Sequence, residues 1–464
     1  MFTDDDTIAA ISTPLGEGGI GIVRLSGKGS LQIAEKIFSS PVNKSLGNLK
    51  PFSLVYGHIR EPLTGQKVDE VLVTVMKSPH SYTKEDVVEI NCHGGMITLR
   101  KTLELVLKQG ARLAEPGEFT KRAFINGRID LSQAEAVLDL IRSKTDESRR
   151  VAIEQLQGGL SEKITALRDR LTEICVSVEA CIDFPEDEIE TLTRQDLLDA
   201  MEDTGRELEK LLKTYDEARF FREGLSTAIV GRTNVGKSSL LNALLRKDRA
   251  IVTDVPGTTR DVIEEYLNIN GLPLRIMDTA GIRDVQDIAE KEGVKRSLRS
   301  IENADLVIAI FERSEPLKDE DFEVIEKIKK KNAIIVLNKC DLPALVDKDF
   351  LTSRLTPHAL RVLDVSATRG DGLEELKESI FNSCLKDWKE EREGVVVTNL
   401  RHRNAIEDAG SSLVRAVQAL TGNQPVEILA LELRDSLDRL GEIVGAVTTE
   451  DILNRIFSEF CIGK

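Results

Sequence analysis

Short apolar runs recur in the middle of this chain. Runs at 227–230, 272–277, 333–337 and 362–365 are each followed at once or within a few residues by glycine or polar residues. Continuous apolar runs of this length are typical of buried strands. The first run is followed by a helical pattern at 239–245, so this region predicts strands and helices of an α/β domain.

The pattern differs on either side. Residues 1–118 mix β-like runs and turn signals with one helical pattern at 96–108, which predicts a separate α/β domain. Apolar residues at helical spacing dominate the segments 131–182, 196–213, 405–420, 425–440 and 449–460. The simplest architecture is multidomain α/β plus α, with a central helical domain in two halves, 119–219 and 384–464, and an α/β domain inserted at 220–383. A capping box is expected at Thr448–Asp451.

The inserted domain carries a phosphate-binding motif. Gly231-Arg-Thr-Asn-Val-Gly-Lys237-Ser238 has the spacing G-x-x-x-x-G-K-S between a predicted strand and a predicted helix. Backbone N–H groups of such a loop cradle phosphates, Lys237 reaches the β- and γ-phosphates, and Ser238 ligates Mg²⁺. The alternative is a glycine-rich turn that binds nothing, but the strand, the lysine and the serine together favour the phosphate loop.

Three further motifs follow in the order that a GTPase requires. Asp278-Thr-Ala-Gly281 follows one apolar run, Asn338-Lys-Cys-Asp341 closes the next, and Ser366-Ala-Thr368 closes the last. A carboxylate such as Asp341 only accepts hydrogen bonds, which suits the N–H edge of guanine and not adenine. Each motif alone is weak, and N-K-x-D alone could be a surface turn. Their order predicts GTP over ATP and a Ras-like P-loop GTPase domain.

Two positions are unusual for such a domain. Ile282 stands where Ras-like GTPases have the glutamine that orients the attacking water, so another group must do this. Asn234 is either a turn former or, through its carbonyl oxygen, a ligand for a monovalent cation. Such a cation would stabilise the transition state electrostatically.

The chain closely resembles the MnmE (TrmE) family of tRNA-modifying GTPases over essentially all of its length. The resemblance rests on the phosphate loop, on 255–261 and 278–283, on 7–27, and on the ending Cys461-Ile-Gly-Lys464. It implies K⁺ at Asn234, Thr253, Val255 and Thr258, with Mg²⁺ at Ser238 and Thr259. It also implies that Glu290 positions the hydrolytic water, although from the sequence alone Glu290 is one acid in a charged stretch. The catalytic residues are then Lys237, Glu290 and Cys461. The GTP-binding residues are Gly231, Asn234, Val235, Gly236, Lys237, Ser238, Ser239, Thr253, Asp254, Val255, Pro256, Gly257, Thr258, Thr259, Asp278, Thr279, Ala280, Gly281, Asn338, Lys339, Asp341, Ser366, Ala367 and Thr368.

The resemblance also implies a second chemical centre. The family's N-terminal domain is similar to tetrahydrofolate-binding domains, and its folate contacts match Arg24, Glu89, Arg128 and Lys464. The ligand would be a 5-substituted or methylene tetrahydrofolate, and Cys461 would supply a thiol. The alternatives are an ordinary surface ion pair for the charged residues and a small packed side chain for Cys461.

The implied activity is K⁺-activated GTP hydrolysis during 5-carboxymethylaminomethyl or aminomethyl modification of the tRNA wobble uridine. The implied partners are a second copy of the chain, tRNA, and MnmG, which brings FAD and NADH and forms a heterotetramer with it. The alternative is a regulatory or ribosome-assembly GTPase switch, but such proteins usually append a basic RNA-binding domain, which is not visible here.

Composition limits these possibilities. The net charge of −16 argues against broad electrostatic binding of nucleic acid, so tRNA should use local basic patches or a partner. None of the 6 cysteines forms a C-x-x-C pair, which supports neither a disulfide framework nor a zinc site. No long apolar run predicts a membrane span, and the acidic N-terminus lacks the features of a signal peptide. We therefore expect a cytoplasmic protein.

Overall fold

The computed structural model divides into two compact units. One unit contains the described residues up to Leu138 together with Gly441–Lys464, and the other contains those from Asp139 to Leu440. The structure describes residues 6–41, 45–183, 193–248, 265–277, 300–346, 348, 351–352, 359–385 and 394–464.

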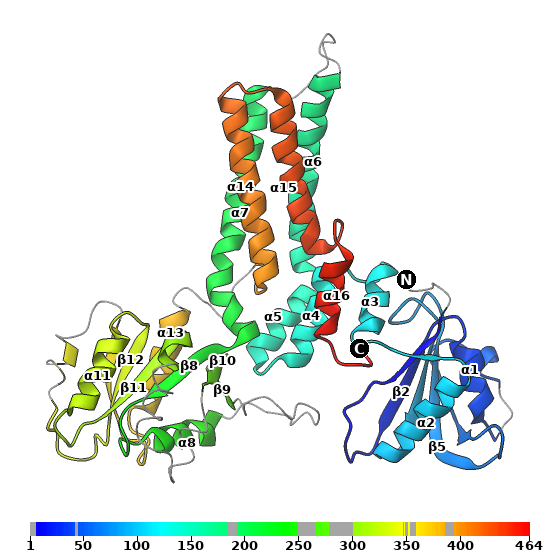
Figure 1. The fold of residues 1–464 in the computed structure, drawn as a ribbon, viewed down its shortest axis with the longest axis horizontal. Coiled ribbons are helices and arrows are strands. Elements are labelled where there is room, and N and C mark those ends of the chain that lie inside the picture. The colour runs from blue at the N-terminus through cyan, green and yellow to red at the C-terminus, as the bar shows by residue number, and fades with distance from the viewer. Residues whose placement is uncertain are drawn as a thin grey trace. The chain divides into compact units, whose positions relative to one another are not determined.

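The first unit includes the strands labelled β2 and β5 in Figure 1. It is built on a sheet that has seven strands within the described ranges, in the order β3-β4-β5-β6-β2-β1-β7. Neighbours are antiparallel except β1 and β7, which are parallel. The strands are β1 (Ile8–Ile11), β2 (Gly21–Ser26), β3 (Phe38–Ser39), β4 (Ser53–Arg60), β5 (Lys67–Met76), β6 (Val87–Cys92) and β7 (Arg112–Leu113).

Two helices, α1 (Ser30–Ile37) and α2 (Met96–Lys108), supply apolar side chains to the core of this sheet. Ile33 and Leu105 belong to the same buried cluster as Ile90 of β6. Side chains alternate between the two faces of a strand, so the neighbours of these buried strand residues point to the other face. That face carries the polar side chains discussed below.

The C-terminal end of the chain folds into the same unit. Helix α16 (Glu450–Ser458) packs Phe457 into a small apolar cluster with Leu131 and Leu138. The residue that caps α16 is Thr449, whose Oγ1 accepts from the Ile452 N–H at 3.4 Å, so the predicted capping box lies one residue too early. The other helices of this region are η1 (Leu46–Asn48), α3 (Glu118–Ile125) and α4 (Leu131–Arg142).

The second unit contains a sheet of order β13-β12-β11-β8-β10-β9, with six strands in the part of the chain that is described. Only β9 among these runs antiparallel to its neighbour. The central strands β8, β11 and β12 are buried along their whole length, as their continuous apolar runs predict. The strands are β8 (Leu225–Val230), β9 (Glu265–Ile269), β10 (Leu272–Ile276), β11 (Leu306–Glu312), β12 (Ala333–Asn338) and β13 (Ala359–Val365).

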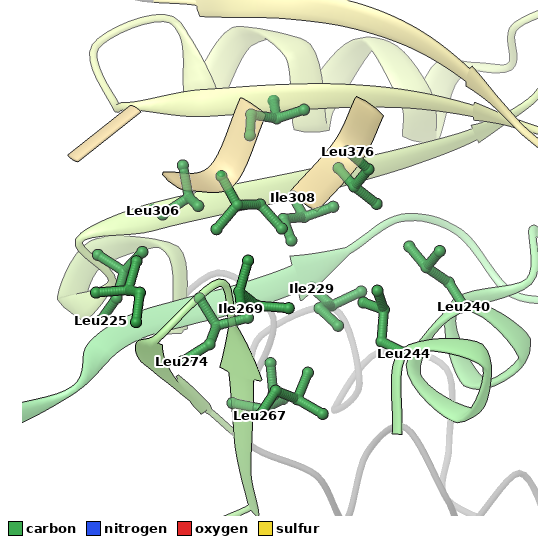
Figure 2. Close-up of a cluster of buried hydrophobic side chains, with 14 of the residues drawn as sticks. Leu225, Ile229, Leu240, Leu244, Leu267, Ile269, Leu274, Leu306, Ile308 and Leu376 are labelled. Atoms are coloured by element: carbon green, nitrogen blue, oxygen red, sulfur yellow. The ribbon is translucent and has the colours of Figure 1, made fainter. Parts of the chain in front are cut away.

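Helices flank this sheet and close its core. Figure 2 shows Ile229 of β8 and Ile308 of β11 within a cluster that also holds Leu244 and Leu376. Leu244 and Leu376 belong to helices of the unit. Burial of each of these apolar side chains contributes about 1.5–3 kcal/mol to the free energy of folding. The flanking helices are α8 (Lys237–Asp248), α11 (Asp319–Ile328) and α13 (Leu373–Cys384).

The same unit includes a bundle of long helices, which run side by side in Figure 1. Helix α7 is longer than its pattern at 196–213 predicts and leads through Gly224, at φ +77°, directly into β8. Within the described residues, no helix is both long and apolar enough to cross a membrane. The bundle helices are α6 (Gly159–Asp183), α7 (Arg194–Glu223), α14 (Leu400–Thr421) and α15 (Val426–Val444), and the shorter α5 (Asp146–Leu156) precedes α6.

Candidate functional site

The glycine loop after β8 has the backbone that its sequence requires. Gly231, Asn234 and Gly236 have positive φ angles of 150°, 67° and 100°. A Cβ atom at Gly231 would lie against the carbonyl oxygen of Ile310, and one at Gly236 would lie against the side-chain nitrogen of Asn338. Larger residues are therefore excluded at both glycines, and the loop turns tightly from β8 into the N-terminus of α8.

Lys237 lies over this loop. Its Nζ donates to the carbonyl oxygens of Gly231 and Arg232 at 2.7 and 2.8 Å. Burial lowers the pKa of the Lys237 ammonium. Because these carbonyls belong to the loop itself, the ammonium is already held where phosphate oxygens would meet the helix N-terminus. Val235, Ser238 and Ser239 lie in the same turn and the first turn of α8.

Asn338, the last residue of β12, joins the loops. Its Nδ2 donates to the carbonyl oxygen of Val235 at 2.8 Å, and its Oδ1 accepts from the Ala367 N–H at 3.1 Å. Strands β8, β12 and β13 contribute their carboxyl ends to the same edge of the sheet, which is the usual ligand-binding edge of such a fold. The phosphate loop, the N-K-x-D motif and the S-A-T motif are thus brought together by one buried side chain.

The Asp341 carboxylate is oriented from the next loop. Ser366 Oγ donates to Asp341 Oδ1 at 2.7 Å and lies 3.2 Å from Thr368 Oγ1. The hydrogen bond from Ser366 and a backbone hydrogen bond lower the pKa of Asp341, so the group stays ionised at neutral pH. An ionised, oriented carboxylate can accept two N–H groups from a planar base.

Sequence reasoning missed Glu312, which lies between the two loops. Glu312 is the last residue of β11, and its Oε2 lies 2.7 Å from Lys339 Nζ. Arg232, in the glycine loop, also lies close to it, with 4.0 Å between the charged atoms. The available signal in the sequence was an acidic residue directly after the apolar run 306–311.

Several predicted site residues lie outside the described residues. They comprise residues 253–259, the D-T-A-G motif and the predicted water-positioning acid, so their placement stays a prediction. They are Thr253, Asp254, Val255, Pro256, Gly257, Thr258, Thr259, Asp278, Thr279, Ala280, Gly281 and Glu290.

The predicted folate contacts lie in the other compact unit. Arg24 of β2 and Glu89 of β6 are paired in the sheet register, and Arg24 Nε donates to Glu89 Oε1 at 2.8 Å. The Arg24 guanidinium also lies over the Phe119 ring, 5.6 Å from its centroid. Both charged side chains are partly exposed, at 17% and 20%, so they stay accessible to a ligand.

The C-terminal segment is docked beside this ion pair. Ile462 forms a β-bridge with Pro116, and the Phe119 N–H donates to the Lys464 carbonyl oxygen at 3.2 Å. Arg24 Nη1 donates to the Gly463 carbonyl oxygen at 3.4 Å. Burial lowers the pKa of Lys464. The tail is therefore ordered by main-chain contacts, and Cys461 lies exposed at its start.

Arg128 belongs to the same region but makes a different contact. Its guanidinium lies 4.7 Å from the ring centroid of Tyr82, whose hydroxyl is 2.9 Å from Thr120 Oγ1. Burial raises the pKa of Tyr82, while the nearby charges of Arg128 and Arg24 oppose that shift. Tyr82 is thus close to both arginines, and sequence reasoning missed it.

The described residues contain no group of three or more His, Cys, Asp or Glu side chains that could hold a metal ion. The P-loop hydroxyl of Ser238 fits a Mg²⁺ site that is completed by other residues and phosphate oxygens. The side-chain carbonyl oxygen of Asn234 is chemically suited to ligate a monovalent cation.

Two family models match consecutive parts of this chain. The family described as the MnmE helical domain matches residues 131–461, and the family described as the GTP-binding protein TrmE N-terminus matches residues 7–128. The tRNA modification GTPase MnmE of Thermoanaerobacter pseudethanolicus is 49% identical over 459 residues, with 99% of both chains covered. That of Clostridioides difficile is 49% identical over 464 residues, with 100% of both covered.

Among solved structures, the G domain of the T. maritima FeoB iron transporter is 26% identical and covers 34% of this chain and 96% of its own, with a TM-score of 0.25. A score this low adds nothing to the description of the fold. The family matches and the two sheets together confirm the predicted multidomain α/β plus α fold class.

Proposed function

This chain belongs to the MnmE family of tRNA modification GTPases, and from that premise we propose that it couples K⁺-activated GTP hydrolysis to modification of the wobble uridine of tRNA, together with MnmG. It is a P-loop GTP hydrolase that acts in tRNA modification. The finer statements, which concern K⁺, folate, MnmG, a homodimer and a cytoplasmic location, are our proposal.

One observation supports the proposal: two chemically different groups of polar residues lie in two separate compact units. The loops around Lys237 and Asp341 suit a guanine nucleotide, whereas in the other unit Arg24 pairs with Glu89 and contacts the C-terminal segment. A simple GTPase switch needs only the first site. The second site supports a modification enzyme, in which nucleotide hydrolysis drives conformational change rather than the modification chemistry itself.

In the nucleotide site, Lys237 would turn from the loop carbonyls to phosphate oxygens, and Asp341 would accept N–H groups of guanine. Bound Mg²⁺ and K⁺ would supply positive charge where negative charge develops during hydrolysis. Asn234 and Ser238 would contribute oxygen atoms from the described part of the loop. The remaining proposed ligands and Glu290 come from segments outside it.

In the second site, Glu89 would accept paired N–H groups of a pterin, while Arg24 or Arg128 would meet folate carboxylates. The exposed Cys461 thiol lies in the segment that Arg24 contacts through Gly463. We therefore propose that a one-carbon tetrahydrofolate binds here and that Cys461 takes part in the modification. The flavin and nicotinamide chemistry would come from MnmG.

The domain limits 1–118, 119–219 with 384–464, and 220–383 remain a prediction. The family matches at 7–128 and 131–461 are compatible with such an arrangement.

Nucleoside analysis of tRNA tests the proposal. A strain that lacks its own family member is complemented with this chain, and the wobble uridine is analysed by mass spectrometry. We expect the modified uridine to return with the intact chain. If GTP is hydrolysed but the uridine stays unmodified, the chain is a GTPase switch and the proposal fails.

A further inference from the structure

We propose that Glu312 is a positioning residue that links the phosphate loop to the base loop and presets Lys339 for the nucleotide. Glu312 ends β11, and β11 lies between β8 and β12 in the sheet. Strand β8 runs into the phosphate loop, and β12 runs into the base loop. Glu312 therefore lies at the carboxyl edge of the sheet, between the two halves of the proposed nucleotide site. The inference rests on that proposed site.

The first link is to the base loop. Glu312 Oε2 lies 2.7 Å from Lys339 Nζ, and Glu312 Oε1 accepts from Ser314 Oγ at 2.9 Å. The Glu312 side chain is 8% exposed, whereas that of Lys339 is 35% exposed. Lys339 also has a φ of +60°, an unusual backbone for a lysine. A buried carboxylate thus fixes the end of a long side chain that would otherwise move freely.

The second link is to the phosphate loop. Arg232 Nη2 lies 4.0 Å from Glu312 Oε2 and 2.8 Å from Glu315 Oε2, and Arg232 Nε lies 3.4 Å from Asp321 Oδ2. The carbonyl oxygen of Arg232 accepts from Lys237. The loop residue that holds the phosphate-binding lysine is therefore anchored by carboxylates, one of which also holds Lys339.

This arrangement has a consequence for binding. A buried carboxylate near an anion site is unfavourable unless cations neutralise it, and Glu312 has two cationic neighbours. Fixing Lys339 before the nucleotide arrives removes the entropy cost of ordering it during binding. Loss of Glu312 should then weaken every nucleotide that uses Lys339. It should not change the preference for guanine, because Asp341 is held separately by Ser366.

The test measures binding of a fluorescent GDP derivative to the full chain. Glu312→Gln keeps the size of the side chain and removes its charge, so we expect about tenfold weaker binding from the loss of one charge-assisted hydrogen bond. Glu326→Gln is the matched control, because Glu326 pairs with Lys329 at the end of α11, is 63% exposed and does not belong to the nucleotide loops. We expect its affinity to stay within about twofold of wild type.

A double-mutant cycle shows whether Glu312 acts through Lys339. In the Lys339→Met background, Glu312→Gln should cause little further loss, because the interaction is already gone. The ratio of GDP to IDP affinity should be the same in wild type and Glu312→Gln. A purely structural effect would instead lower the unfolding midpoint and add to the Lys339→Met effect.

Three results overturn the inference. They are wild-type affinity in Glu312→Gln, an equal loss with and without Lys339, or wild-type affinity in Lys339→Met. Wild-type affinity in Lys339→Met overturns the inference even if Glu312→Gln fails to fold. Absence of GDP binding by the wild-type chain would instead refute the proposed nucleotide site.

Discussion

Asn338 and Val235 are joined by a 2.8 Å hydrogen bond from the asparagine Nδ2 to the valine carbonyl oxygen. Asn338 ends β12, whereas Val235 lies in the phosphate loop after β8. The same asparagine accepts from the Ala367 N–H through its Oδ1. Three loops that are far apart in the sequence thus share one buried side chain, and the geometry of the nucleotide site depends on it.

Replacement of Asn338 by alanine should therefore disturb binding and stability together. Two backbone groups lose their partner, so we expect at least tenfold weaker GTP binding and a loss of about 1–3 kcal/mol in the free energy of unfolding. Nucleotide titration and denaturant unfolding measure the two effects. Asn332→Ala is the control, because Asn332 lies just before β12 and donates to Ser383 at 3.4 Å. Equal effects of the two substitutions would contradict the linking role of Asn338.

Hydrolysis should depend on the monovalent cation. Asn234 is proposed to supply an oxygen ligand to K⁺, and the smaller Na⁺ fits the same ligands poorly. We expect fast GTP hydrolysis in K⁺, slow hydrolysis in Na⁺, and no difference between the salts in Asn234→Ala. Steady-state phosphate release in matched chloride salts measures this. Equal wild-type rates in the two salts would refute it.

Glu290 is proposed to position the hydrolytic water in place of the glutamine that Ile282 replaces. Glu290→Ala should lower kcat by roughly two or more orders of magnitude and leave GTP affinity nearly intact. Single-turnover hydrolysis and equilibrium titration separate the two quantities. A loss of nucleotide binding would show that Glu290 has a structural role.

Cys461 should be needed for modification and not for GTP hydrolysis. Cys461→Ser removes the thiol at almost constant volume, and the residue is exposed, so folding should be unaffected. We expect normal GTP hydrolysis and no modified wobble uridine in a complemented deletion strain. Cys181→Ser is a suitable control, since Cys181 is also exposed but lies in α6. Full restoration of the modification by Cys461→Ser would make the thiol dispensable.

Gly463 should be as important as the thiol, for a steric reason. Its φ is +97°, and a Cβ atom would lie against the carbonyl oxygen of Ile11. Gly463→Ala should therefore displace the tail and abolish modification, with GTP hydrolysis unchanged. Gly410→Ala is the control, because no atom lies within 4 Å of a Cβ at that helical position. Normal modification in Gly463→Ala would show that docking of the tail is not required.

The nucleotide loops could be predicted from the sequence because each depends on residues that are close together in the chain. An apolar run, a glycine loop and a helix form one local unit, and the spacing of Gly231, Gly236 and Lys237 specifies its backbone. Helix positions were likewise predictable from periodicity. The predicted ends of helices were wrong in two places, at the cap Thr449 and in the length of α7. Neighbouring residues there have similar helix propensity, so only packing decides at which residue the helix begins or ends.

The sequence by itself determined which chemical groups are available: a phosphate loop, a carboxylate suited to a guanine base and the thiol of Cys461. Only the tertiary structure decided which of them meet. The pairing of Arg24 with Glu89 depends on the register of β2 and β6, the position of Cys461 depends on a bridge between Ile462 and Pro116, and the role of Glu312 depends on strand order. These contacts join residues far apart in the chain, and strand order and register arise from packing of the whole sheet rather than from any local pattern.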